Sequence, residues 1–264
     1  MDIGATIVQR VVMSKTIGRR LRVVKQVLAS LLLGAILVFA LNAANAQSSQ
    51  TISPEGYVDL AGIWPTPSNI TVCWEPAAER YDQEKAWVQD TVSQFIVGNS
   101  SVRFANWNEC APASMGIRIN IVDEWPRSEV GHQWVRDPKN PHIIVQDVAT
   151  ARPLELPTHM FLNFTFSKQF AECAADREHC IRAISLHEML HALGFLHEQL
   201  RSDTPPACKD RYKSMNDFGG ISPLEVTAHY DSDSHMNYCA NMYRKPIRLS
   251  EGDIQVLKAL YTSQ

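Results

Sequence analysis

Residues 187–198 of the chain read HEMLHALGFLHE. On a helix, His187 and His191 lie one turn apart and project from the same face, so both imidazoles can reach one metal ion. Gly194 allows the helix to end in a sharp backbone turn, and that turn brings His197 toward the same ion. Three neutral imidazoles leave the fourth coordination position of zinc open, which is typical of a catalytic rather than a structural site. We therefore predict that these three histidines bind one catalytic Zn²⁺ ion.

Glu188 directly follows the first of these histidines. A carboxylate at this position can reach a water on the ion without binding the ion itself, as a general base must. A lone His-Glu-x-x-His pair also arises on ordinary amphipathic helices, and in that alternative the histidines have only a structural role. A glycine and a third histidine at these offsets favour the metal site. We therefore predict that Glu188 is the catalytic base.

Two segments further along the chain extend this pattern. Residues 230–238 read YDSDSHMNY, and residues 249–261 read LSEGDIQVLKALY. Together with the HExxHxxGxxH motif and its continuation HEQLR at residues 197–201, they make the sequence resemble the astacin-like zinc metallopeptidases of the metzincin clan over residues 187–261. The resemblance implies an α+β fold: a metzincin-like two-lobe catalytic domain with a mixed twisted sheet, a zinc-binding active-site helix, a Met-turn and a C-terminal helix.

The resemblance also implies roles for single residues. Met236 would lie in the tight turn beneath the three imidazoles, where it packs and does not bind the metal. Tyr238 would be the phenol that hydrogen-bonds the developing oxyanion, with a buried aromatic beside Cys239 as the alternative. Glu198 would lie in a buried polar network that can meet the mature N-terminus, with a surface carboxylate as the alternative. With Gly194, Met236 and Glu198 form the structural support of the predicted site.

A few positions depart from the family pattern. Asn237 stands where astacins usually have histidine, and Thr204 and Pro205 interrupt an Asp-Arg-Asp run that often follows the third ligand. The cysteine positions differ from those of the best-known members. Asp59 lacks the surroundings of the family's aspartate switch, so the route of activation stays open.

The first 46 residues are typical of a secretory signal peptide. A basic segment precedes an apolar run at residues 27–41, and small residues follow it. The run is short for a membrane span, so we predict cleavage after Ala46 and no stable membrane insertion afterwards; an uncleaved anchor is the alternative. Residues 47–60 are predicted to be a flexible mature N-terminus or a short pro-segment. Residues 61–264 are predicted to be the catalytic domain, with an upper lobe over about 61–197 and a lower lobe over about 198–264.

Charge and cysteines narrow the possible partners and the compartment. Removal of residues 1–46 leaves 19 basic and 27 acidic side chains, a balance that argues against a nucleic-acid partner. The remaining six cysteines form an even number in an exported chain, so we predict three disulfides. Only the pairing of Cys173 with Cys180 is favoured by spacing, and the other pairings stay open. We expect a monomer in a secreted, periplasmic or extracellular location.

Periodicity predicts a mixed sheet and three helices. Short runs rich in branched or aromatic residues predict strands at residues 70–74, 117–122, 142–145 and 160–164. Helical spacing of apolar residues predicts helices at residues 81–97, 181–193 and 251–261, the last with Ser250 as cap and Asp253 at the capping-box position. The long stretch from residue 197 to residue 250 is predicted to consist of loops.

The predicted function is that of a secreted zinc-dependent endopeptidase, which hydrolyses peptide bonds in proteins through a zinc-bound water activated by Glu188. The resemblance implies that its substrate is an extended polypeptide that pairs with an edge strand, and residues 160–164 are the candidate for that edge. Two alternatives remain open: a secreted binding module in which the metal only braces the fold, and a zinc hydrolase that acts on peptidoglycan or an ester.

Overall fold

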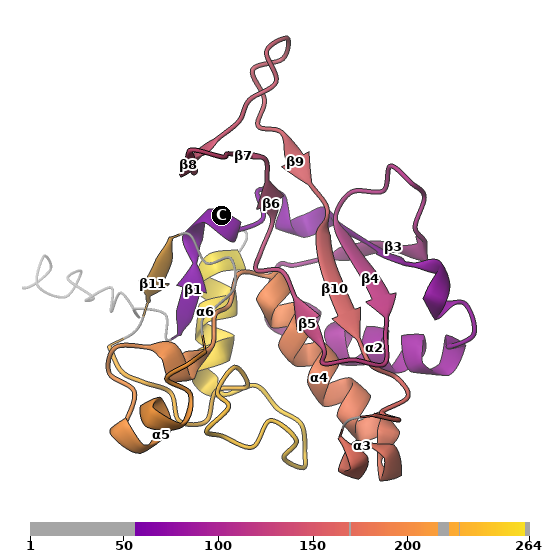
Figure 1. The fold of residues 1–264 in the computed structure, drawn as a ribbon, viewed down its shortest axis with the longest axis vertical. Coiled ribbons are helices and arrows are strands. Elements are labelled where there is room, and N and C mark those ends of the chain that lie inside the picture. Colours follow the sequence, from indigo (N-terminus) through magenta and orange to yellow (C-terminus); the bar gives the residue numbers. More distant parts are fainter. Residues whose placement is uncertain (1–55, 169, 216–221, 227, 262–264) are drawn as a thin grey trace, which may run out of the picture. The chain divides into compact units, whose positions relative to one another are not determined.

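A five-stranded mixed sheet in the order β3-β2-β4-β10-β5 organises the first part of the fold (Figure 1). The structure is a computed structural model, and it describes residues 56–168, 170–215, 222–226 and 228–261. Four strands run parallel, and only β5 is antiparallel to its neighbour β10. The bounds are β2 Ile70–Trp74, β3 Phe104–Glu109, β4 Ile117–Ile121, β5 Arg127–Ser128 and β10 Thr158–Leu162. The prediction of an α+β fold with a mixed sheet is therefore confirmed.

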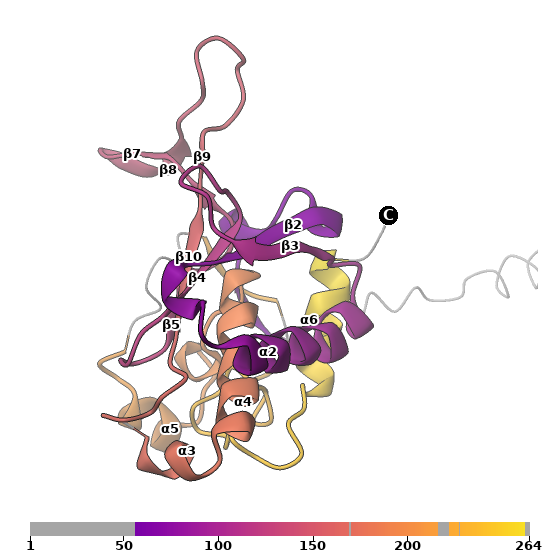
Figure 2. The ribbon, with the colours of Figure 1, turned by 90° about the vertical axis from the view of Figure 1, so that its right-hand side faces the viewer.

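One face of this sheet is covered by two helices. In β4, Ile117, Ile119 and Ile121 are buried while the residues between them are partly exposed, as the two-residue period of a strand requires. Helices α2 (Asp82–Phe95) and α4 (Arg177–Ala192) pack against each other, and Figure 2 shows both on the same side of the sheet. The main hydrophobic core lies between these layers and holds α4 in place.

Helix α4 begins four residues before the predicted start at residue 181. The polar run at residues 176–179 indicates a loop, but its residues form the solvent-facing first turn of the helix. The Arg177 guanidinium donates to the carbonyl of Phe164 at 2.8 Å and to Glu84 at 2.5 Å, which anchors this turn to the rest of the fold. Helix α2 lies within the range predicted for it, residues 81–97.

The predicted edge strand is wrong. Strand β10 lies between β4 and β5 inside the sheet, and the edge strands are β3 and β5. Because β5 has only two residues, it carries too few alternations for its sequence to indicate a strand. The predicted strand at residues 142–145 overlaps β8 (Asn140–Ile144), which pairs with β7 (Arg136–Asp137) outside this sheet. Beside it, β6 (Gln133–Trp134) pairs with β9 (Glu155–Leu156), and both pairs project beyond the five strands (Figures 1 and 2).

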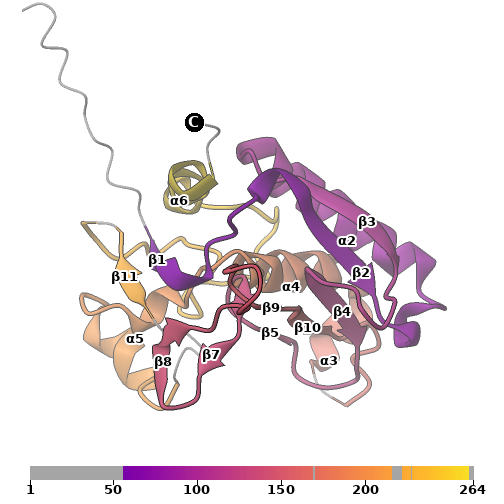
Figure 3. The same ribbon diagram turned by 90° about the horizontal axis from the view of Figure 1, so that it is seen from above.

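The segments that follow α4 pair with the beginning of the described chain. Strand β1 (Tyr57–Asp59) is antiparallel to β11 (Pro223–Glu225), and the two lie side by side in Figure 3. The last residues of the predicted flexible segment 47–60 therefore form a strand, which corrects the end of that range; residues 47–55 lie outside the described residues. The predicted loops after residue 197 include η5 (Glu198–Leu200) and α5 (Pro206–Arg211).

The C-terminal helix α6 (Glu251–Tyr261) has the predicted bounds. Its capping box is complete, because the Ser250 N–H donates to Asp253 at 3.0 Å and the Asp253 N–H donates to the Ser250 hydroxyl at 2.9 Å. The remaining short helices are η1 Leu60–Gly62, η2 Pro67–Asn69, η3 Pro76–Ala78, η4 Val97–Asn99 and α3 Ala171–Ala175. Within the described ranges, no helix has the length and apolarity needed to cross a membrane.

All six cysteines pair with one another. The disulfides are Cys73–Cys110, Cys173–Cys180 and Cys208–Cys239. The predictions of three disulfides and of the Cys173–Cys180 pair are thereby confirmed. Complete pairing is typical of proteins that fold in an oxidising compartment.

Helix α4 ends in a Schellman motif at Gly194. The Gly194 N–H donates to the His191 carbonyl at 2.8 Å, and the Phe195 N–H donates to the Leu190 carbonyl at 3.0 Å, the two bonds that define this motif. Gly194 has a φ of +92°, a conformation that side chains with a Cβ rarely adopt. The reversal directs the chain back toward the face of α4 that carries its histidines.

Four more donors reach the carbonyls at this helix end, each from a different part of the fold. Such carbonyls have no partner within the helix, so these bonds fix where the helix end lies. The Gly131 N–H donates to His191 at 2.8 Å, the Trp64 indole N–H to Ala192 at 2.7 Å, the Tyr261 hydroxyl to Leu193 at 2.8 Å, and the Asp59 N–H to Gly194 at 2.8 Å.

Gly194→Ala is expected to lower the free energy of unfolding by about 1–2 kcal/mol, the usual cost of a left-handed residue that carries a Cβ. The added Cβ would also lie 3.2 Å from Ile63 Cδ1. Urea denaturation followed by circular dichroism measures the change. Gly98→Ala is the matched control, because its added Cβ meets only the Ser93 carbonyl at 3.6 Å. Equal stability of the two variants would contradict the prediction.

Candidate metal centre

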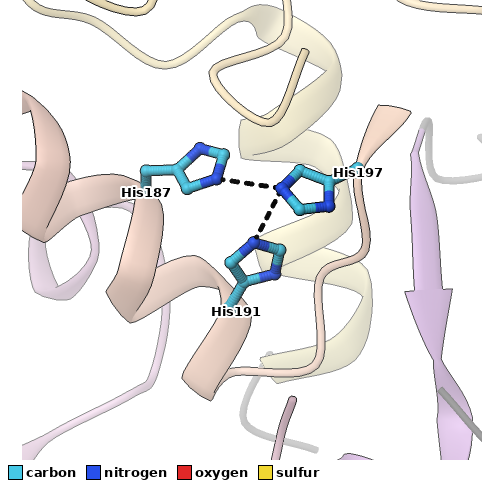
Figure 4. A group of neighbouring side chains, drawn as sticks. All are labelled: His187, His191 and His197. Carbon is cyan, nitrogen blue, oxygen red and sulfur yellow. Dashed lines mark hydrogen bonds between the residues drawn. The ribbon is translucent and has the colours of Figure 1, made fainter. Parts of the chain in front are cut away.

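Three imidazoles from two segments converge on one point (Figure 4). His187 and His191 project from α4, and His197 follows the turn at Gly194. The Nε2 atom of His197 lies 3.3 Å from that of His187 and 3.1 Å from that of His191. The potential ligand atoms all lie within 4.8 Å of one another, and all three side chains are buried. The structure therefore brings together the three histidines that the motif singles out.

Backbone carbonyls set the tautomer of two of these rings. His187 Nδ1 lies 3.0 Å from the carbonyl oxygen of His235, and His191 Nδ1 lies 2.8 Å from that of Phe195. A carbonyl only accepts, so each Nδ1 carries the proton and donates it. Each Nε2 then presents its lone pair toward the centre of the cluster. This second layer of bonds is the usual way in which proteins orient metal-binding histidines.

The cluster fits a zinc ion. Tetrahedral zinc with nitrogen ligands at about 2.0–2.1 Å places those nitrogens about 3.3 Å apart, close to the two spacings around His197. A cation at this point would be bound by the lone pairs that His187 Nε2 and His191 Nε2 direct toward the centre of the cluster. Burial, and then the charge of the neighbouring imidazoles, hold the pKa values of His187 and His191 well below the usual range. Both rings are therefore neutral, which is the form that binds metal.

Glu188 directly follows the ligand His187 on α4 and is buried, with 4% of its surface exposed. Its Oε2 has no hydrogen-bond partner among the described residues. Burial raises the pKa of this carboxyl to about 8, and the positive charge of Arg127 acts in the opposite direction. A cation bound by the imidazoles would lower this pKa further. A buried, unpartnered carboxyl beside a metal-ligand cluster has the features of a general base.

A pocket of about 650 Å³ opens at His187 and Glu188. Tyr238 and Tyr212 form part of its wall, and the rest is mostly apolar. A pocket of this size with few polar groups is typical of a site that binds organic ligands. The other lining residues are Trp125, Pro126, Phe170, Ile184, Met215, Ala240, Asn241, Met242 and Tyr243.

The turn at residues 234–238 lies directly against the cluster. The Tyr238 ring stacks on the His187 ring with a centroid distance of 5.3 Å and an interplanar angle of 17°, and it lies 4.6 Å from the His197 ring. Met236 is buried in the hydrophobic core, and its carbonyl accepts the Glu198 N–H at 3.1 Å. Tyr238 therefore lies against two of the imidazoles, and Met236 is bonded through its carbonyl to the residue that follows His197.

Glu198 is buried, which excludes the alternative of a surface carboxylate. It accepts the Asp231 N–H at 2.7 Å and lies 3.4 Å from the Arg201 guanidinium, which is itself buried. Burial raises the pKa of Glu198 to about 8, with these two partners opposing the rise. The contact with a mature N-terminus stays a prediction, because residues 47–55 lie outside the described residues.

Two residues support the site in roles that no motif indicates. The carbonyl of His235 orients His187, and a backbone acceptor gives no side-chain signal in a sequence. Asp253 is buried and accepts from the Ser234 hydroxyl at 2.7 Å and from the His235 N–H at 2.8 Å. The capping-box position predicts that Asp253 caps α6. Its bonds to Ser234 and His235 form only because the turn at residues 234–238 lies at the start of α6, and the sequence does not indicate this contact.

Comparison with known proteins gives little further information. No protein-family model matches the chain, and no curated protein matches it. Among solved structures, the chain is similar to that of myroilysin, with 15% sequence identity, a TM-score of 0.45, and coverage of 79% of this chain and 100% of that one. Any assignment of function therefore rests on the geometry of the site.

The purified protein is expected to bind one zinc ion per chain. His191→Ala removes one of the converging ligands and is expected to reduce bound zinc to well below one equivalent, measured by inductively coupled plasma mass spectrometry after dialysis. Loss of zinc should also lower the melting temperature, because the ion binds only the folded state. His142→Ala is the matched control, since His142 is an exposed histidine on β8. Full zinc occupancy in the His191 variant would exclude this ligand set.

Proposed function

We propose that this chain is an exported zinc-dependent endopeptidase of the astacin-like type. The observation that carries the proposal is the pairing of a three-imidazole cluster with the buried, unpartnered Glu188 at the end of one large pocket. A structural zinc site has no use for such a carboxyl, whereas a hydrolytic site requires a base next to the metal. The catalytic domain would extend over residues 61–264, with β1 added at its start.

The residues around the pocket can divide the steps of peptide hydrolysis among them. Zinc, when bound, supplies Lewis acidity that polarises a carbonyl and makes water more acidic. The Glu188 carboxylate would take a proton from the attacking water and pass it to the leaving amine. Its burial favours uptake of that proton, because a carboxyl in an apolar site is more stable when neutral. Tyr238, beside two of the imidazoles, would donate a hydrogen bond to the oxyanion.

The proposed substrate is an extended polypeptide. Strand β5 is the last strand of the five-stranded sheet, and it contacts α4. Trp125 and Pro126, which directly precede β5, line the pocket. A peptide that adds to this edge would therefore pass beside Glu188, with main-chain hydrogen bonds that do not depend on its sequence. A peptide bound in this way would have its main chain next to the base, which favours a peptide bond over a side-chain ester or a sugar as the group that is cleaved.

Export is proposed from the N-terminal sequence and from the disulfides. The signal-peptide pattern of residues 1–46 lies outside the described residues, while all six later cysteines are paired. Pairing of this kind persists outside the reducing cytosol. We propose that the protein is a monomer in a secreted or periplasmic location.

Glu188→Gln tests the proposed base. The variant is expected to keep one zinc ion per chain and to lose casein cleavage by about 100-fold or more, the typical contribution of a general base. Wild-type cleavage should stop when a chelator removes the metal and return when zinc is added. The measurements are zinc content and the release of acid-soluble peptides.

Glu79→Gln is the control, since Glu79 is exposed and lies between η3 and α2. Full activity in the Glu188 variant would overturn the assignment of the base. Zinc binding without cleavage of any protein substrate by the wild type would favour a secreted binding module. Activity on peptidoglycan or an ester alone would favour a zinc hydrolase that acts on those substrates.

A further inference from the structure

The peptide backbone of Tyr238 is held on both sides by side chains that lie outside the HExxHxxGxxH motif. Its N–H donates to Gln199 Oε1 at 2.9 Å, and its carbonyl accepts from the Tyr212 hydroxyl at 3.1 Å. Both polar groups of this residue's main chain are therefore bonded to side chains, although the residue belongs to no helix or strand. A turn residue usually leaves such groups to solvent, so this arrangement restrains Tyr238 more than its turn requires.

The three groups that hold this segment come from two places, the chain after His197 and helix α5. Gln199 is fully buried and lies two residues after the ligand His197. Tyr212 directly follows helix α5, and its ring lies 5.8 Å from that of Tyr238. The Cys208–Cys239 disulfide ties the same helix to the residue after Tyr238. The segment is thereby fixed both to the chain that carries a metal ligand and to α5.

The backbone position determines where the phenol of Tyr238 lies. The ring is attached to a backbone bonded on both sides and lies against the His187 and His197 rings at 5.3 and 4.6 Å between centroids. A group that must donate to an oxyanion depends on its position, and a displacement of about 1 Å can reduce turnover by about 100-fold. Groups that restrain the backbone at this residue would therefore affect the chemistry through the position of the Tyr238 phenol.

We propose that Gln199, Tyr212 and the Cys208–Cys239 disulfide form a positioning clamp that sets the Tyr238 phenol for oxyanion stabilisation; this inference rests on the proposed function. Gln199 accepts a hydrogen bond from the Tyr238 N–H, and Tyr212 donates one to the Tyr238 carbonyl. The disulfide limits movement of Cys239, the next residue in the chain. These groups act through Tyr238. The disulfide also makes the clamp sensitive to reduction, because its loss frees α5 from the turn.

Tyr212→Phe tests the clamp, because it removes one hydroxyl and keeps the ring. The variant is expected to lower kcat by about tenfold, a part of the roughly 100-fold loss expected for Tyr238→Phe, with little change in KM. The two changes together should cost no more than Tyr238→Phe alone, since a clamp has no effect once its target is gone. A merely structural role for Tyr212 would instead multiply the two losses.

Backbone mobility gives a readout that does not depend on activity. Hydrogen exchange measured by mass spectrometry should show faster exchange over residues 236–240 in Tyr212→Phe, with or without zinc, and unchanged exchange in α4. The Cys208→Ser/Cys239→Ser pair should show the same local effect. Tyr81→Phe is the control, because its hydroxyl only accepts from the exposed Arg80 side chain.

The outcomes separate the clamp from the proposed function. Local acceleration together with a non-multiplicative kcat loss supports the clamp. Unchanged exchange over residues 236–240, or multiplicative losses in the double variant, overturns it even if the enzyme is active. A wild type that cleaves no peptide overturns the proposed function, and the exchange measurement then still decides whether these groups hold the Tyr238 backbone.

Discussion

The end of helix α4 depends on hydrogen bonds from the whole fold. Its last carbonyls would be unsatisfied inside the protein, and a buried carbonyl without a donor costs about 1–3 kcal/mol. Trp64, Tyr261 and Asp59 each satisfy one of them, and Gly131 adds a second donor to the His191 carbonyl, which also accepts the Gly194 N–H. These donors come from the segment after β5, the connection before η2, the C-terminal helix and the first strand. The requirement to satisfy one helix end therefore brings four distant segments together at the point where the chain reverses toward His197.

A second set of bonds acts from the opposite side of the cluster. Asp253, at the start of α6, holds the Ser234 hydroxyl and the His235 N–H, and the His235 carbonyl in turn orients the His187 ring. Helix α6 thus acts on the site at both ends: its first turn fixes the turn at residues 234–238, and Tyr261 in its last turn reaches the end of α4. Removing either contact would loosen the geometry of the imidazoles without touching them.

The sequence predicts those parts whose signal is local. The period of α6, the alternation in β4 and the spacing of Cys173 and Cys180 each depend on residues close together in the chain. The same holds for His187, His191 and Gly194, which one helix and its end bring into place. Strand β5 is too short to show a period, so the sheet edge is assigned wrongly. The acceptor carbonyl of His235 and the donors at the end of α4 depend on contacts across the whole chain, and their residue types do not indicate them.

Hydrogen bonding differs between the carboxyl groups that support the cluster and the carboxyl of Glu188. Around the cluster, the carbonyls at the end of α4 and the main chain of Tyr238 all have partners, and the buried Glu198 and Asp253 accept several bonds. Glu188 Oε2 is the one buried carboxylate oxygen without a partner in the described part of the chain. Leaving this carboxyl oxygen without a donor inside the protein has a stability cost. That cost has a physical reason where the carboxyl must exchange protons with a substrate, because a partner in the resting state would have to be displaced before each transfer.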